Sequence, residues 1–335
     1  MKTVYARRGA AFLILYVIAV GYASLYPWEF SYTTSAPPLS WHGLSSRIFL
    51  LDSFLNIVFY APLGAAAFVV FGGRAAGLFF AVAMGFTLSF GVEEAQRYTS
   101  RMGDYNDIVS NTLGTAVGAF AGYAWSRTHG SGIRAAIARR APAEGLVLAA
   151  LWLTWNVFLL LPAFSRRPLP DGVFPPAWSQ ALNEALGAGV VAIALRRGAC
   201  FLRRTLAPAL LLWLAIQELT PFQWGVRQDF SWLPFEGLFY NRPEVYYPIL
   251  FGKLFFYTVV VWALRFRGTG WFWSVSAPIA LLAVGEWAQT YIPERTPEST
   301  DLVLAAGGAF VLWMAAPGLP ETQRSGYTAC SEVKG

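Results

Sequence analysis

Two stretches of the sequence carry acidic, amide and guanidinium side chains at matching spacing. The first set is Glu93, Gln96, Arg101 and Asp107, and the second is Glu286, Gln289, Arg295 and Asp301. In each set the Glu and Gln lie three residues apart, which places them one above the other on a helical face. Such a set could bind an anionic group through the arginine, orient a ligand by hydrogen bonds, or transfer a proton.

The chain around these sets is strongly apolar. Hydrophobic residues make up 56% of the 335 residues and charged residues only 13%, against roughly 25% charged in globular proteins. A soluble fold could not cover its surface with so few charges, and a disordered chain would be far less apolar. Two cysteines exclude a disulfide scaffold. We therefore expect an all-α fold, a polytopic bundle of transmembrane helices.

Ten apolar stretches approach the length of about 20 residues that a membrane span requires. They are residues 10–26, 54–72, 75–90, 108–125, 146–164, 182–195, 206–219, 247–266, 271–291 and 302–316. The sixth is short and contains Asn183 and Glu184, so an interfacial helix is the alternative there.

The basic residues predict the orientation in the membrane. With the amino terminus in the cytoplasm, the inner segments carry about twice as many Lys and Arg as the outer ones, as the positive-inside rule expects. Both termini are then cytoplasmic in a bacterial-type plasma membrane, and both polar sets face outward. The net charge of +6 is explained by topology, so nucleic acid is not expected as a partner. Cys200 and Cys330 lie on the reducing side, where no disulfide is expected.

The two polar sets belong to a predicted internal repeat. Leu25-Tyr26-Pro27-Trp28 precedes the first set much as Leu219-Thr220-Pro221-Phe222 precedes the second. Spans one to four would correspond to spans seven to ten, and an offset of six spans makes the repeat parallel. The predicted organisation is a first repeat (1–126), a central two-span region (127–204), a second repeat (205–317) and a cytoplasmic tail (318–335).

Further polar residues lie on the neighbouring spans. Asn56 precedes Pro62-Leu63-Gly64 in the second span, and Asn111 and Gly114 continue the face of Asp107 at helical spacing. A proline there kinks the helix, and a packing kink with close approach at Gly64 is as good an explanation as a functional one.

The second copy differs from the first in two of these positions. Lys253 stands near the position of Asn56, and Ala305 replaces Asn111. A lysine within the bilayer needs an acid, and Glu286 is the expected partner. Because the second set is altered, we expect the first to be the ligand site.

Two interpretations of the polar sets remain open. Asp107 and Asp301 stand at predicted helix starts, where an acid satisfies free amides, and the arginines could pair with them to close a loop. Alternatively, the sets contact a ligand, because charge within spans is costly and a Glu–Gln pair is not needed to close a short loop. His42 and His129 fall on opposite sides of the membrane, so we expect no metal and no cofactor.

The first set resembles the motif of VanZ-like membrane proteins. The resemblance rests on Asn56-x-x-Phe59-x-x-Pro62-Leu63-Gly64, followed by Glu93-x-x-Gln96, Arg101, Asp107, Asn111 and Gly114. The resemblance covers residues 25–122 well and residues 219–310 in weakened form. The chain therefore resembles a tandem VanZ-like protein with a degenerate second copy. The resemblance implies an integral membrane protein, and the founding member of that family is associated with low-level teicoplanin resistance.

Three classes of function are compatible with these features. The first is a non-enzymatic envelope protein, whose partners are membrane lipids and a lipid-linked envelope precursor or an amphiphilic antibiotic. The second is an intramembrane enzyme that uses Glu93 or Asp107 as general acid/base. The third is a transporter, which ranks last because its charges would be expected near the bilayer middle. The sequence leaves the oligomeric state and any catalysed reaction open.

Overall fold

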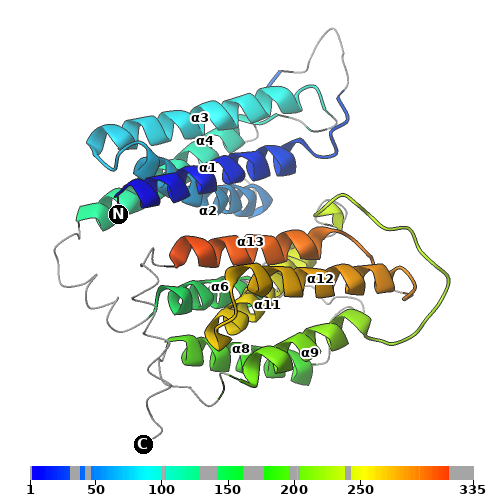
Figure 1. Cartoon of the computed structure of the whole chain (residues 1–335). Helices are drawn as coiled ribbons and strands as arrows, with labels where there is room; N and C mark the ends of the chain where they lie inside the picture. Colours follow the sequence, from blue (N-terminus) through cyan, green and yellow to red (C-terminus); the bar gives the residue numbers. More distant parts are fainter. Residues whose placement is uncertain are drawn as a thin grey trace, which may run out of the picture. The chain divides into compact units, whose positions relative to one another are not determined.

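The computed structural model describes residues 2–30, 38–41, 47–99, 101, 103–127, 142–160, 177–195, 202, 204–237, 243–293 and 295–316. Within these ranges the regular structure is helical, with two isolated β-bridges. Cys200, Cys330, His42, His129 and the predicted tail at 318–335 lie outside the described residues. The chain divides into two compact units, Met1–Ala135 and Ala136–Gly335, called unit 1 and unit 2 below (Figure 1).

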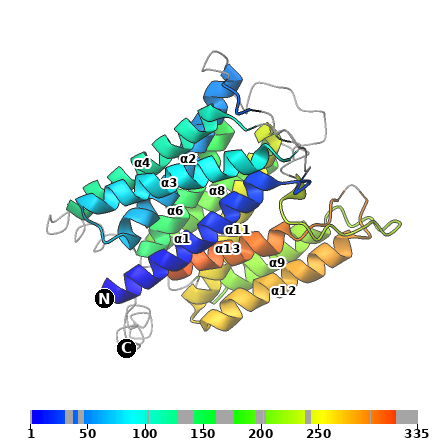
Figure 2. The ribbon, with the colours of Figure 1, turned by 90° about the horizontal axis from the view of Figure 1, so that it is seen from above.

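Unit 1 is a bundle of four helices. These are α1 (Lys2–Leu25), α2 (Arg47–Val70), α3 (Ala75–Gln96) and α4 (Tyr105–Arg127). The main contact is between α2 and α4, and α3 lies along both α1 and α4 (Figure 2). Since α3 continues six residues beyond the predicted span at 75–90, Glu93 and Gln96 both lie in its last turns.

Unit 2 is built around one long helix. Its helices are α6 (Ala143–Leu160), α8 (Ala177–Leu195), α9 (Leu206–Leu219), α11 (Pro243–Arg267), α12 (Trp271–Gln289) and α13 (Thr300–Ala315). Helix α11 contacts α6, α9, α12 and α13, and α12 lies beside α9 (Figure 2). The buried core includes Leu148 of α6, Phe255 of α11, Leu282 of α12 and Leu312 of α13.

Several helices are suited to a membrane. Among the described residues, four segments are long and apolar enough to cross one: Arg8–Leu25, Asp52–Val70, Ala75–Gln96 and Tyr246–Arg267. Large apolar side chains such as Ile14, Phe79 and Phe120 are exposed on the outside of unit 1, where water would disfavour them and lipid would not. These features support a membrane protein. Each of the ten predicted segments overlaps one of the helices, while the number that cross a membrane stays a prediction.

Glycines set the close approach of α2 and α4. A Cβ on Gly64 would collide with the backbone carbonyl of Thr115, and one on Gly118 would collide with that of Ala61. Pro62 lies inside α2, between these contacts. The alternative explanation of the Pro-Leu-Gly segment, a packing site where Gly64 admits a neighbouring backbone, is therefore the one that the geometry supports.

Replacing either glycine should separate the two helices. We expect Gly64→Ala and Gly118→Ala each to lower the free energy of unfolding by about 1–3 kcal/mol, the usual cost of overpacking. The measurement is thermal unfolding of the purified protein in detergent. Gly91→Ala is the matched control, because nothing lies within 4 Å of its position in α3; the control should be as stable as wild type or more so. Wild-type stability of Gly64→Ala would contradict the packing role.

Candidate functional site

The first turn of α4 holds an acid that is fixed from α2. Asp107 Oδ1 accepts a hydrogen bond of 2.9 Å from Asn56 Nδ2. The close approach of α2 and α4 brings these two side chains together, and Gly114 packs against the backbone of Ile57 next to Asn56. Both Asp107 and Asn56 are partly exposed, so this end of the contact is accessible.

The acid of α3 holds the loop that leads into α4. Glu93 is 2% exposed, and its Oε2 accepts the backbone N–H of Asp104 at 2.8 Å. The same loop is paired to Ser40, whose N–H donates to Gly103 O and whose carbonyl accepts from Tyr105 N–H, both at 3.0 Å. One oxygen of Glu93 is therefore committed to the loop backbone.

Two buried polar atoms beside Glu93 lack a hydrogen-bond partner among the described residues. They are the hydroxyl of Tyr60 and Oδ1 of Asn111, on side chains that are each 5% exposed. Asn111 Nδ2 donates to Ser89 Oγ at 3.0 Å, and the Tyr60 hydroxyl lies close to Ser89 and Glu93. Buried polar groups are nearly always bonded, and an unsatisfied one costs about 1–3 kcal/mol. These atoms are thus free to bond a ligand.

We refer to this group as the unit 1 polar cluster. It consists of Asn56, Tyr60, Ser89, Glu93, Asp107 and Asn111.

Gln96 and Arg101 bond to backbone carbonyls at the end of α1. Gln96 Nε2 donates to Ser24 O at 2.8 Å, and Arg101 Nη1 donates to Ser24 O at 3.2 Å and Ala23 O at 3.5 Å. The last carbonyls of a helix lack intrahelical partners, and a cation there also complements the helix dipole. Both side chains therefore tie the end of α3 and its loop to the end of α1. The pairing of Arg101 with an acid, which was one of the two interpretations left open, is not among these hydrogen bonds.

In unit 2 the corresponding acid is held by a lysine. Lys253 Nζ of α11 lies 2.8 Å from both carboxylate oxygens of Asp301, in the first turn of α13. The Tyr257 hydroxyl donates to Asp301 Oδ2 at 2.6 Å. The side chain of Asp301 is 1% exposed and that of Lys253 is 38% exposed. The sequence predicted Glu286 as the partner of Lys253; that prediction is wrong, because the ion pair is with Asp301.

Glu286 instead holds the loop before α13. Its Oε2 accepts the backbone N–H of Glu298 at 2.9 Å, the counterpart of the bond from Asp104 to Glu93. Ser231 pairs with this loop through Pro297 O at 3.0 Å and Ser299 N–H at 3.1 Å. Burial raises the pKa of the Glu298 carboxyl above its ordinary value.

An arginine bonds to the carbonyls at the end of α9, as Arg101 does at the end of α1. Arg295 donates to the carbonyls of Thr220 and Gln217, each at 2.7 Å. Gln289 Nε2 donates to Glu218 Oε2 at 2.6 Å, a side-chain contact where Gln96 uses a backbone carbonyl. Glu218 was not predicted from the sequence, although a single acid near the end of the apolar stretch 206–219 is a signal that could have found it.

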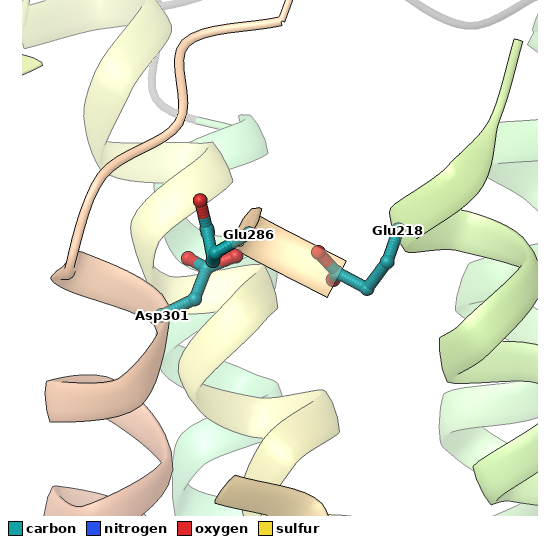
Figure 3. Close-up of side chains that lie close together, drawn as sticks. All are labelled: Glu218, Glu286 and Asp301. Carbon is teal, nitrogen blue, oxygen red and sulfur yellow. The ribbon is translucent and has the colours of Figure 1, made fainter. Parts of the chain in front are cut away.

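Three acids of unit 2 converge. Glu218, Glu286 and Asp301 are buried and place carboxylate oxygens within 4.8 Å of one another, with Glu218 pointing from α9 toward the other two (Figure 3). Oxygen ligands of this kind suit hard cations. However, both oxygens of Asp301 already accept from the Lys253 ammonium, which supplies positive charge at this place. We assign no metal to these residues.

The predicted repeat allows the two units to be compared position by position. In that alignment Lys253 stands for Asn56, Leu282 for Ser89 and Ala305 for Asn111. Unit 2 neutralises Asp301 with its own lysine, whereas unit 1 has an amide in place of the ammonium and leaves the Tyr60 hydroxyl and Asn111 Oδ1 without a hydrogen-bond partner among the described residues. The sequence analysis missed Tyr60, Ser89 and Tyr257, which have no charge to mark them.

Comparison with known proteins identifies part of the chain. Residues 11–126 match the VanZ/LLP1 family model, which spans α1 to α4 and confirms the resemblance to VanZ-like proteins over unit 1. No curated protein and no solved structure matches the chain.

Removing the lysine of unit 2 should leave Asp301 buried without its main donor. We expect Lys253→Met to lower the free energy of unfolding by about 1–3 kcal/mol, the cost of a buried acceptor that has lost its bond. Thermal unfolding in detergent measures the change. The double variant Lys253→Met/Asp301→Asn should recover much of the loss, because the two residues interact directly. An unchanged Lys253→Met would show that the ion pair adds nothing to stability.

Proposed function

Since unit 1 is VanZ-like over residues 11–126, we propose that the chain is a multi-pass membrane protein of the cell envelope that binds a lipid-linked or amphiphilic ligand. The unit 1 polar cluster binds the polar group of that ligand. The observation that carries this proposal is the pair of buried, unpartnered atoms at Tyr60 and Asn111. A ligand that bonds both atoms would repay their desolvation.

Binding is favoured over catalysis by the engagement of the candidate catalytic groups. Glu93 Oε2 accepts the backbone N–H of Asp104, and Asp107 Oδ1 accepts a hydrogen bond from Asn56. Each candidate acid/base group therefore already has a structural bond. Transport is disfavoured for unit 1, because Glu93 and Asp107 lie at helix ends and transporter sites lie near the bilayer middle.

We further propose that unit 2 contains a second, altered copy of unit 1. Three contacts of unit 1 recur in unit 2 at matching positions. They are Glu93–Asp104 and Glu286–Glu298, Asn56–Asp107 and Lys253–Asp301, and Arg101 and Arg295 on helix-end carbonyls. With ten spans and both termini in the cytoplasm, the unit 1 polar cluster would face outward, where envelope precursors and glycopeptide antibiotics are met.

The test removes only the unpartnered hydroxyl. Tyr60→Phe should leave thermal stability unchanged or slightly raised, because the hydroxyl has no partner among the described residues. The same variant should weaken retention of a fluorescent undecaprenyl-linked peptidoglycan precursor by about tenfold, the value of one lost hydrogen bond in a desolvated site. Purified protein in nanodiscs provides the measurement, and teicoplanin sensitivity of expressing cells provides a second readout.

Glu94→Gln is the matched control. Glu94 follows Glu93 on α3 but pairs with Arg97, outside the polar cluster, so its binding should equal that of wild type. Equal retention by wild type and Tyr60→Phe would overturn the proposal. Conversion of the precursor to a new product by wild type would replace binding with catalysis.

A further inference from the structure

We propose that the group bound by the unit 1 polar cluster is a primary ammonium, which takes the place that Lys253 fills in unit 2. This inference rests on the proposed binding function and specifies the chemistry of its ligand. Unit 2 shows the arrangement when it is complete: an ammonium on both oxygens of the first-turn acid, with a tyrosine hydroxyl on one of them.

The charge around the unit 1 polar cluster favours a cation. Glu93 and Asp107 belong to the cluster, and Asp52 and Asp104 lie close enough to Asp107 to act on it electrostatically. Against these four acids the nearby base is Arg101, which is exposed and already bonded to the end of α1. A bound cation would relieve the repulsion among the acids, as Lys253 does beside Asp301.

The available hydrogen-bonding atoms match an ammonium in number and kind. A primary ammonium has three N–H donors and no acceptor. Among the described residues, Asn56 is the side chain that donates to Asp107, whereas Asp301 receives three bonds from Lys253 and Tyr257. Acceptors available to an ammonium in the described part of unit 1 include the second carboxylate oxygen of Asp107, Asn111 Oδ1 and the Tyr60 oxygen. A quaternary ammonium has no N–H to give these acceptors, so the primary form is favoured.

The position of the ammonium is accessible at the helix ends. Asp107 and Asn56 are both partly exposed, so a ligand can reach the acid of α4 from there. An aminophospholipid headgroup and the free amine of a lipid-linked peptide share this chemistry.

The experiment introduces into unit 1 the lysine that unit 2 has at the corresponding position. Asn56→Lys should place an internal ammonium beside Asp107 and block the site, while thermal stability stays equal to wild type or rises. Radiolabelled dodecylamine, measured by equilibrium retention on purified protein in nanodiscs, should bind wild type saturably. Its affinity should fall by about tenfold or more in Asn56→Lys, because a charge-assisted bond is worth at least that factor.

Two further measurements control for misfolding of the variant and for non-specific partitioning of the amine into the nanodisc. Asp107→Asn is isosteric, removes the negative charge and replaces one acceptor oxygen with an NH2 donor. It should therefore also weaken dodecylamine binding while the protein remains folded. Dodecyltrimethylammonium has the same charge and chain without N–H donors, and it should compete poorly. Competition by nanodiscs rich in phosphatidylethanolamine would identify a lipid source, and competition by free ethanolamine alone would identify a soluble amine.

The results separate this inference from the proposed function. If Tyr60→Phe weakens the undecaprenyl-linked precursor but Asn56→Lys binds dodecylamine as wild type does, the site exists and the ammonium assignment is wrong. Equal competition by dodecyltrimethylammonium would overturn it in the same way. If Tyr60→Phe has no effect on the precursor, the proposed function itself fails.

Discussion

An acid at the start of the last helix of each unit needs a donor, and a neighbouring helix, α2 in unit 1 and α11 in unit 2, supplies it. A carboxylate inside an apolar bundle is costly unless it is bonded. Asp107 receives its bond from Asn56, and Asp301 receives its bond from Lys253. In each unit, the helix with the acid and the helix with the donor must therefore keep a fixed position along each other. In unit 1 this requirement explains why glycine is needed where α2 meets α4: the backbones approach closely enough for a short asparagine to reach the acid.

The remaining acid of each unit acts on the backbone. Glu93 accepts the N–H of Asp104, the residue before α4, and Glu286 accepts that of Glu298, two residues before α13. These bonds fix each loop and thereby the direction in which α4 or α13 begins. The arginine of each loop then fastens it to the end of α1 or α9. Gln96 and Arg101 therefore lock the loop, as the structural interpretation of the polar sets expects. The ligand interpretation stays a prediction for the other members of the sets.

The sequence predicted the helices well because apolar length is a strong local signal, and the three-residue spacing correctly placed Glu93 and Gln96 on one helix. It could not choose the partner of Lys253, because Glu286 and Asp301 come from different helices and both approach the same place. The partners of Arg101 are backbone carbonyls, which leave no mark on a sequence. Tyr60 could not be identified from the sequence, because the sequence does not show whether a buried hydroxyl has a hydrogen-bond partner.

Unit 2 shows which of the buried polar side chains its helices need in order to pack. There the position of Ser89 is Leu282, that of Asn111 is Ala305, and both are buried. Tyr257, at the position of Tyr60, is bonded to Asp301. These helices thus pack around their buried acids without the extra serine and amide. In unit 1 the serine and the amide are present, and Asn111 Oδ1 and the Tyr60 hydroxyl have no hydrogen-bond partner among the described residues, which lowers stability. The proposed ligand would offset this cost by bonding both atoms.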